Sequence, residues 1–283
     1  MIRLLIRLLV CILALQLSQS KVFAEEEKQP PPVPPIQDNS FLVEEAYNQD
    51  FGVVQHISTL THMWNSKDWV YTLTQEWPAP GIRHQLSYTL AYQHAGAYPD
   101  SGFGIGDIWF NYRYQMIGNG DTRVAFAPRL SSLAPTGRAT VGRGLGSFGV
   151  QTNLPASVVI SSKLVTHWNA GATLIPRAQD GLGHRASSAG YNLGQSFVYL
   201  AKPRFNFLLE TVYTGSQTVV GKNQTEWNKS LYVSPGVRWA YNFKSGLQVV
   251  PGVGMPIGVG PSQGEKGVFL YLSFEHPFRR LGK

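Results

Sequence analysis

The sequence holds a single cysteine, Cys11, among its 283 residues. Cys11 lies in an N-terminal leader that we expect to be removed, so the mature chain is predicted to form no disulfide and to perform no thiolate chemistry. Only 14% of the residues are charged, well below the roughly 25% of an ordinary soluble domain. The net charge of +7 includes the charges of the leader. Without the leader, the net positive charge is small, which argues against nucleic acid as a partner.

Long hydrophobic runs and catalytic motifs are missing as well. Outside the leader, no apolar run approaches the about 20 residues that a transmembrane helix needs. The 7 histidines are scattered, and none stands with cysteine or carboxylate at metal-ligand spacing, so no metal is expected. Residues 144–149 match the pattern G-x-G-x-x-G. They lack a βαβ unit and an acidic ribose partner, so no dinucleotide cofactor is expected.

The first 24 residues have the layout of a secretory signal peptide. Arg3 and Arg7 precede a short apolar core, and Ala24 stands just before the expected cleavage point. We therefore divide the chain into a signal peptide (1–24), a proline-rich N-terminal segment (25–50), a transmembrane β-barrel (51–278) and a C-terminal tail (279–283). Residues 39–50 are predicted either to plug the barrel or to hang in the periplasm.

The mature chain is rich in segments where apolar and polar residues alternate, the pattern of strands with two different faces. Val237, Trp239 and Tyr241 alternate with Arg238, which predicts that the first three face lipid and that Arg238 faces the lumen. The segments exceed the about 5–6 residues of soluble strands and match the about 9–11 of membrane strands. We predict twelve strands, with ten or fourteen as alternatives: 52–63, 68–77, 83–94, 105–117, 121–133, 148–160, 163–175, 190–201, 204–216, 230–243, 245–257 and 267–278.

The connectors between these strands alternate in length. Short ones follow the even-numbered strands, and long ones follow most odd-numbered strands: 95–104, 134–147, 176–189, 217–229 and 258–266. Outer-membrane barrels have short periplasmic turns and longer extracellular loops. The fold class predicted is therefore all-β, an antiparallel up-and-down barrel in the outer membrane of a bacterial cell, in contact with its lipids. Tryptophans near the predicted strand ends suit the interfacial girdles of such a barrel: Trp64, Trp69, Trp77, Trp227 and Trp239.

Charged residues on the polar faces are the candidate lumen-lining residues: Arg83, Asp107, Arg113, Arg123, Arg129, Lys163, Glu210, Arg238 and Glu275. They are consistent with a polar passage for a small-molecule solute, and equally with a non-conducting structural barrel sealed by salt bridges. No catalytic residue is assigned. The enzyme alternative is an outer-membrane lipid or ester hydrolase, in which His167 and Asn169 would act with nearby Ser161 or Ser162.

Several stretches resemble the outer-membrane proteins of the "MetA-pathway of phenol degradation" family. They are residues 43–57 (VEEAYNQDFGVVQHI), 106–115 (GDIWFNYRYQ), 134–137 (APTG), 234–260 (SPGVRWAYNFKSGLQVVPGVGMPIGVG) and 271–278 (YLSFEHPF). The resemblance implies a barrel channel for passive uptake of small hydrophobic or aromatic compounds. The last strand, which ends at Phe278, also resembles the terminal signature that barrels present to the barrel assembly machinery, the partner expected during insertion.

Overall fold

The structure, a computed structural model, describes residue 36 and residues 40–277. The predicted signal peptide, the polyproline stretch, Phe278 and the C-terminal tail lie outside the described residues. All described residues belong to one compact unit. This described part of the chain contains no helix that is both long and apolar enough to span a bilayer.

One sheet contains all 17 strands of the described chain. Short breaks divide some membrane strands into two pieces, so the pieces make a 12-strand antiparallel barrel, as predicted. In chain order the strands are β1 (Val53–Met63), β2 (Trp69–Pro78), β3 (His84–His94), β4 with β5 (Gly104–Ile105, Ile108–Tyr114), β6 with β7 (Val124–Phe126, Arg129–Ala134), β8 with β9 (Gly149–Asn153, Ala156–Ser161), β10 (Leu164–Gln179), β11 (Arg185–Lys202), β12 (Phe205–Gly221), β13 with β14 (Gln224–Trp239, Tyr241–Asn242), β15 with β16 (Gln248–Gly254, Ile257–Gly258) and β17 (Gly267–Pro277).

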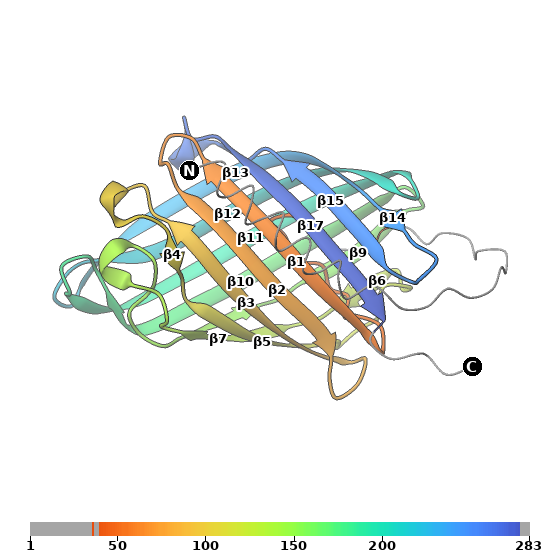
Figure 1. Cartoon of the computed structure of the whole chain (residues 1–283), viewed down its shortest axis with the longest axis horizontal. Coiled ribbons are helices and arrows are strands. Elements are labelled where there is room, and N and C mark those ends of the chain that lie inside the picture. Colours follow the sequence, from red (N-terminus) through yellow and green to blue (C-terminus); the bar gives the residue numbers. More distant parts are fainter. Residues whose placement is uncertain (1–35, 37–39, 278–283) are drawn as a thin grey trace. The chain divides into compact units, whose positions relative to one another are not determined.

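The barrel closes because β1 pairs with both β2 and β17, antiparallel in each case. Figure 1 shows the strands following one another around the barrel in sequence order. Closure leaves no unpaired sheet edge. Three of the breaks within strands fall at Pro128, Pro155 and Pro256. Proline has no N–H to donate to a sheet ladder, so it is accommodated where the pairing is interrupted.

Two predicted loops are wrong. Residues 176–189 and 217–229 were expected to be long connectors, but β10 and β11 continue to Gln179 and Arg185, and β12 and β13 meet at a turn of residues 222–223. Asn223 takes a left-handed φ of 58° in that turn. The two hairpins extend this far because their backbone groups continue to hydrogen-bond to each other, as far as Ala178 opposite Ala186 and Val219 opposite Thr225. We call this end of the barrel the long-loop end and the opposite one the short-turn end.

The two faces of the wall differ as predicted. Leu193 and Leu209 point outward and are 51% and 49% exposed, whereas Ser196 and Glu210 on the inner face are completely buried. Arg238 is 2% exposed inside the barrel. Its neighbours Val237 and Trp239 belong to the outer face, because Val237 pairs with outward Phe207. An apolar exterior around a polar interior inverts the usual arrangement and requires a lipid solvent.

Residues 40–49, which we call the plug segment, lie inside the barrel. Phe41 belongs to the buried cluster that Ile57, Phe269 and Tyr271 line from the wall, and its ring centre lies 5.4 Å from that of Phe269. A Cβ on Gly252 would lie 2.5 Å from Phe41 Cζ, so glycine is what lets the ring approach this part of the wall. Within the described residues, 40–49 of the predicted segment 39–50 therefore pack against the inner side of the wall, and their action as a plug stays a prediction.

We expect the substitution Leu209→Arg to impair barrel folding, because a charge on the lipid face near mid-membrane costs about 2–4 kcal/mol. Thr72→Arg puts the same charge into the open lumen and should be tolerated, and Leu209→Met is the conservative control. Heat-modifiable gel mobility and urea unfolding in lipid vesicles measure the difference. Equal loss of folded protein in both arginine variants would contradict the assignment of faces.

Candidate functional site

The first half of the plug segment is held through its backbone by barrel side chains. The N–H groups of Leu42 and Val43 donate to Glu210 Oε1 at 3.0 and 3.1 Å. The N–H of Glu44 donates to Asn169 Oδ1 at 2.8 Å, and Asn169 Nδ2 returns a hydrogen bond to the Glu44 carbonyl at 2.7 Å. An extended chain without a strand partner must satisfy its backbone in this way when it is buried.

The second half of the segment is held by glutamines. Gln115 Nε2 donates to the Ala46 carbonyl at 2.8 Å, and Gln115 Oε1 accepts from the Asn48 N–H at 3.0 Å. The N–H of Gln49 donates to Gln85 Oε1 at 2.8 Å. These bonds are individually worth about 0.5–1.5 kcal/mol. The segment is therefore docked by many modest, reversible contacts and by no covalent bond.

A charged cluster fixes the middle of the plug segment. Glu44 Oε2 lies 2.9 Å from Arg129 Nε, and Glu44 Oε1 lies 3.5 Å from Arg113 Nη1. Asn153 Nδ2 donates to Glu44 Oε2 at 2.7 Å, and Arg129 Nη1 donates to Asn111 at 2.8 Å. All three ionic side chains are at least four-fifths buried. Glu44 therefore serves as the common counter-ion of two lumen arginines.

Most of the predicted lumen-lining residues lie inside the barrel: Asp107, Arg113, Arg129, Glu210, Arg238 and Glu275. Arg238 donates to Asn206 Oδ1 at 3.1 Å and to the carbonyl of Ile36 at 3.4 Å. Glu275 lies opposite the buried Gln55 across the β1–β17 pair, so the two share the inner face. The structure brings three of the six, Arg113, Arg129 and Glu210, to the plug segment and a fourth, Arg238, to Ile36.

The other three predicted positions are wrong. Arg83, Arg123 and Lys163 lie in turns at the short-turn end and are exposed. The guanidinium of Arg83 donates to the carbonyls of Gln115 and Met116 at 3.2 and 3.3 Å. Each residue immediately precedes a strand, at His84, Val124 or Leu164. The period-2 rule for side-chain direction holds only within paired strands, so it fails one residue outside them.

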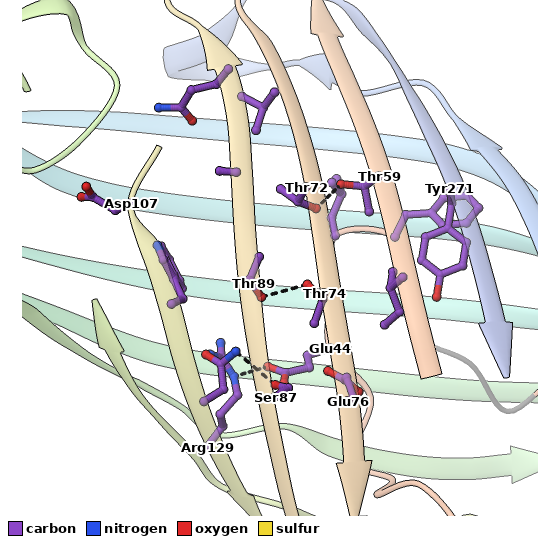
Figure 2. A pocket seen from close by; sticks show the side chains of 18 of the residues that line it. Glu44, Thr59, Thr72, Thr74, Glu76, Ser87, Thr89, Asp107, Arg129 and Tyr271 are labelled. Carbon is purple, nitrogen blue, oxygen red and sulfur yellow. Dashed lines mark hydrogen bonds and ion pairs between the residues drawn. The ribbon is translucent and has the colours of Figure 1, made fainter. Parts of the chain in front are cut away.

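A cavity of about 560 Å³ lies between the plug segment and the loops at the long-loop end. We call it the vestibule. Its wall carries hydroxyl pairs that cross neighbouring strands: Thr59 and Thr72 lie 2.6 Å apart, and Thr74 and Thr89 lie 2.8 Å apart (Figure 2). Its lining also includes aromatic and apolar side chains: Phe41, Leu42, Ile57, Val70, Trp109 and Tyr271. The vestibule lining is therefore amphipathic, because hydroxyl groups and apolar or aromatic side chains stand side by side on it.

The loop between β7 and β8 contributes residues 142–145 to the vestibule. Asp107, at the break between β4 and β5, anchors this loop. Its carboxylate accepts the N–H groups of Gly137 and Leu145 at 2.8 and 2.7 Å. Asp107 is thus a structural anchor in the vestibule lining, and the loop it holds has a defined position relative to the wall.

The hydrolase alternative assigned its residues differently from the structure. His167 Nδ1 lies 2.7 Å from the hydroxyl of Ser157 and not from Ser161 or Ser162. Ser157 is 1% exposed, and its hydroxyl also accepts the N–H of Ala46. Ser161 and Ser162 line a second cavity of about 210 Å³ together with His167. The serine in contact with the histidine is thus sealed beneath the plug segment.

Within residues 36 and 40–277, no three His, Cys, Asp or Glu side chains gather as a metal site would require. The residues that hold the plug segment were mostly not foreseen. Gln85, Gln115, Asn153 and Asn169 are amides on inward strand positions, and all are at least nine-tenths buried. The sequence signal for this was the presence of several amides on the inner faces of predicted strands. An amide both donates and accepts hydrogen bonds, so such residues can hold the backbone of a segment buried inside the barrel.

No protein-family model matches the chain, and no curated protein sequence matches it. Solved structures share its fold. The COG4313 outer membrane channel from Pseudomonas putida F1 aligns with a TM-score of 0.60 and 13% identity, over 82% of this chain and 97% of that one. The NanC porin aligns with a TM-score of 0.51 and 10% identity, over 78% of this chain and 98% of that one. Identities this low show the fold alone, so the resemblance to the MetA-pathway family stays a prediction.

The closed wall and apolar exterior of the barrel indicate the solvent that surrounds it. A closed wall satisfies its own backbone hydrogen bonds, and its outer face offers apolar side chains to the solvent. Only lipid suits such a surface. The chain is a 12-strand antiparallel β-barrel of the bacterial outer membrane.

Proposed function

We propose that this protein is an outer-membrane channel for the passive uptake of small compounds with aromatic or hydrophobic bodies, and that the plug segment is its gate. The observation that carries the proposal is the division of the lumen. The vestibule of about 560 Å³ lies on one side of the plug segment, and the cavity of about 210 Å³ lies on the other. Ser40–Glu44 line the first cavity, and Glu45 and Tyr47 line the second.

The orientation follows the rule that outer-membrane barrels have short periplasmic turns and longer extracellular loops. The vestibule, which the 142–145 loop helps to line, then faces the outside of the cell. The smaller cavity, lined by Gly120, Ser161 and Ser162 of the short turns, faces the periplasm. A solute that reached the vestibule would need the plug segment to move before it could continue. The comparison with a barrel described as an outer membrane channel supports this role.

The vestibule lining favours amphipathic solutes over purely polar ones. Trp109, Tyr271 and Phe41 offer ring faces, which bind apolar and aromatic groups. The threonine hydroxyls donate and accept hydrogen bonds and can serve a phenolic or carbonyl oxygen. Small-molecule sites are mostly apolar with a few polar groups that fix orientation, in cavities of about 300–1,000 Å³. The resemblance to the phenol-degradation family agrees with this class of solute.

The outer wall carries an apolar groove on its lipid side. A groove of about 480 Å³ on the lipid side is lined by Trp64, Phe207, Val253 and Met255 and reaches the glycines of β13 and β15. A Cβ on one of these, Gly236, would lie 2.6 Å from Phe41, so the ring of the plug segment packs against the inner side of the wall behind this groove. The wall itself is closed here by the pairing of β13 with β15, in which Gly236 lies opposite Gly254, so a lateral path to lipid would require these two strands to separate.

A disulfide between the plug segment and the wall tests the gate directly. A Cβ on Gly194 would lie 3.0 Å from Val43 Cγ2, so two cysteines there can meet the Cβ–Cβ spacing of about 3.5–4.5 Å. The only natural cysteine is Cys11, in the predicted leader. We expect Val43→Cys with Gly194→Cys to lower single-channel conductance in a planar bilayer when oxidised, and to recover on reduction.

Each single-cysteine variant serves as the control for that experiment, and mass spectrometry verifies the crosslink. Equal conductance in the oxidised and reduced states of the crosslinked protein would exclude the plug segment as the gate. Zero conductance in the wild type and in the reduced variant, with no flux of neutral aromatics into proteoliposomes, would favour the non-conducting structural barrel.

Neutralising Glu44 should loosen the plug segment. Glu44→Gln keeps the shape of the side chain but leaves Arg113 and Arg129 without their shared carboxylate, which weakens docking by about 1–3 kcal/mol. We expect more frequent or larger openings in planar-bilayer recordings. Glu226→Gln, at an exposed position of β13, is the matched control and should behave as the wild type. Unchanged openings in Glu44→Gln would show that the ion pairs do not hold the gate.

A further inference from the structure

Arg143 stands out among the residues of the vestibule. It follows the short 3₁₀ turn Ala139–Val141 in the loop between β7 and β8, and its N–H donates to the carbonyl of Arg138 at 3.1 Å. Leu145, two residues on, is tied to Asp107. The position of Arg143 is therefore set by its own loop. A Cβ on Gly104 would collide with Arg143 Nη1, so the side chain packs closely against the backbone of β4.

The guanidinium of Arg143 is buried but has no ionic partner in the described part of the chain. The residue is 8% exposed, and its Nε has no hydrogen-bond partner. None of the ion pairs formed within residues 36 and 40–277 involves it. The Asp107 carboxylate of the same lining accepts the N–H groups of Gly137 and Leu145 and forms no ion pair with Arg143. Arg143 differs in this respect from Arg113 and Arg129, which share Glu44.

A buried arginine without a counter-ion is costly. Arginine stays protonated in proteins, and removing an uncompensated charge from water costs several kcal/mol. Its planar fork of N–H groups matches the two oxygens of a carboxylate, or a phosphate, in bidentate geometry. The Arg143 side chain lines a cavity of about 560 Å³. A ligand anion in that cavity would provide the missing partner.

The other charged residues of the vestibule favour a carboxylate over a phosphate as the ligand of Arg143. Its lining includes the carboxylates of Glu44, Glu76 and Asp107 but only one arginine besides Arg143, namely Arg129. A dianionic phosphate would be repelled by these acids more strongly than a monoanion, because Coulomb repulsion scales with the ligand charge. Trp109 and Tyr271 in the same lining suit an aromatic or other apolar body.

We propose that Arg143 is the receptor for the carboxylate of an amphipathic monocarboxylate, and that the vestibule takes aromatic or similarly compact apolar acids. The inference rests on the proposed function and names the substrate class of the same site. The carboxylate pairs with the Arg143 guanidinium, the apolar body lies against the rings, and the threonine hydroxyls serve any additional polar group.

Equilibrium binding to the purified full-length mature barrel in detergent tests this site independently of transport. The probes are phenylacetate, the neutral benzyl alcohol and the dianionic phenyl phosphate, and the readouts are isothermal titration calorimetry and tryptophan fluorescence. Phenylacetate should bind the wild type more tightly than the other two. Arg143→Gln should weaken phenylacetate binding by about tenfold to a hundredfold, the range of a charge-assisted pair, and Arg143→Lys should lose less.

Arg138→Gln, an exposed arginine of the same loop, is the matched control and should bind phenylacetate as the wild type does. Heat-modifiable mobility verifies that each variant is folded. Equal phenylacetate affinity in Arg143→Gln and the wild type would overturn the proposal, as would absence of phenylacetate binding or tighter binding of benzyl alcohol or phenyl phosphate. Phenylacetate binding that depends on Arg143, without any flux through proteoliposomes, would instead contradict the channel and leave the carboxylate site intact.

Discussion

The hydrogen bonds between β1 and β17 are the constraint on which the rest of this structure depends. Lipid offers no partner to a backbone N–H or C=O, so a sheet inside a bilayer must close on itself. The first and last strands pair along their whole lengths, from Val53 opposite Pro277 to Met63 opposite Gly267. Once the wall is closed, alternate side chains must divide between lipid and lumen. Closure thus gives the wall two sides, and the order of residues in each strand makes the outer side apolar and the inner side polar.

The requirement that buried backbone groups form hydrogen bonds also applies to the segment inside the lumen. The plug segment is extended and buried, yet it adds no strand to the sheet, so its backbone must find partners among side chains. Inward amides and carboxylates of the wall provide them, from Glu210 near one end to Gln85 near the other. A strand ladder would hold this segment permanently. Side-chain hydrogen bonds and one carboxylate shared by two arginines hold it in place instead.

Most charges in the lumen have protein partners. The arginines beside the plug segment have carboxylate partners, and the acid beside the vestibule loop is occupied by backbone N–H groups. Arg143 is the exception, since it is buried at the cavity and forms no ion pair with any residue that the structure describes. A lumen sealed for stability alone would be expected to pair this charge too. The exception therefore gives the vestibule a chemical preference that the aromatic lining alone does not have.

The fold could be predicted from sequence because alternation is a local property. Val237 and Arg238 take opposite faces for the same reason in any membrane strand, and the number of strands follows from counting such segments. Properties that depend on the neighbouring strand were harder to predict from the sequence. The ends of β10 to β13 depend on how far two strands continue to pair. The predicted lumen positions of Arg83, Arg123 and Lys163 were wrong because strand pairing begins one residue after each of them.

Residue types and their order thus decided the barrel, its two faces and the presence of inward charges. Tertiary structure alone decided which of those charges meet. Glu44 and Arg129 are 85 positions apart in sequence, and nothing local to either one indicates the other. Whether residues 40–49 enter the lumen depends on amides from several strands converging on one backbone. That Arg143 forms no ion pair within the described residues is likewise visible only in the tertiary structure, because contacts between distant segments are set by the closed wall and not by sequence spacing.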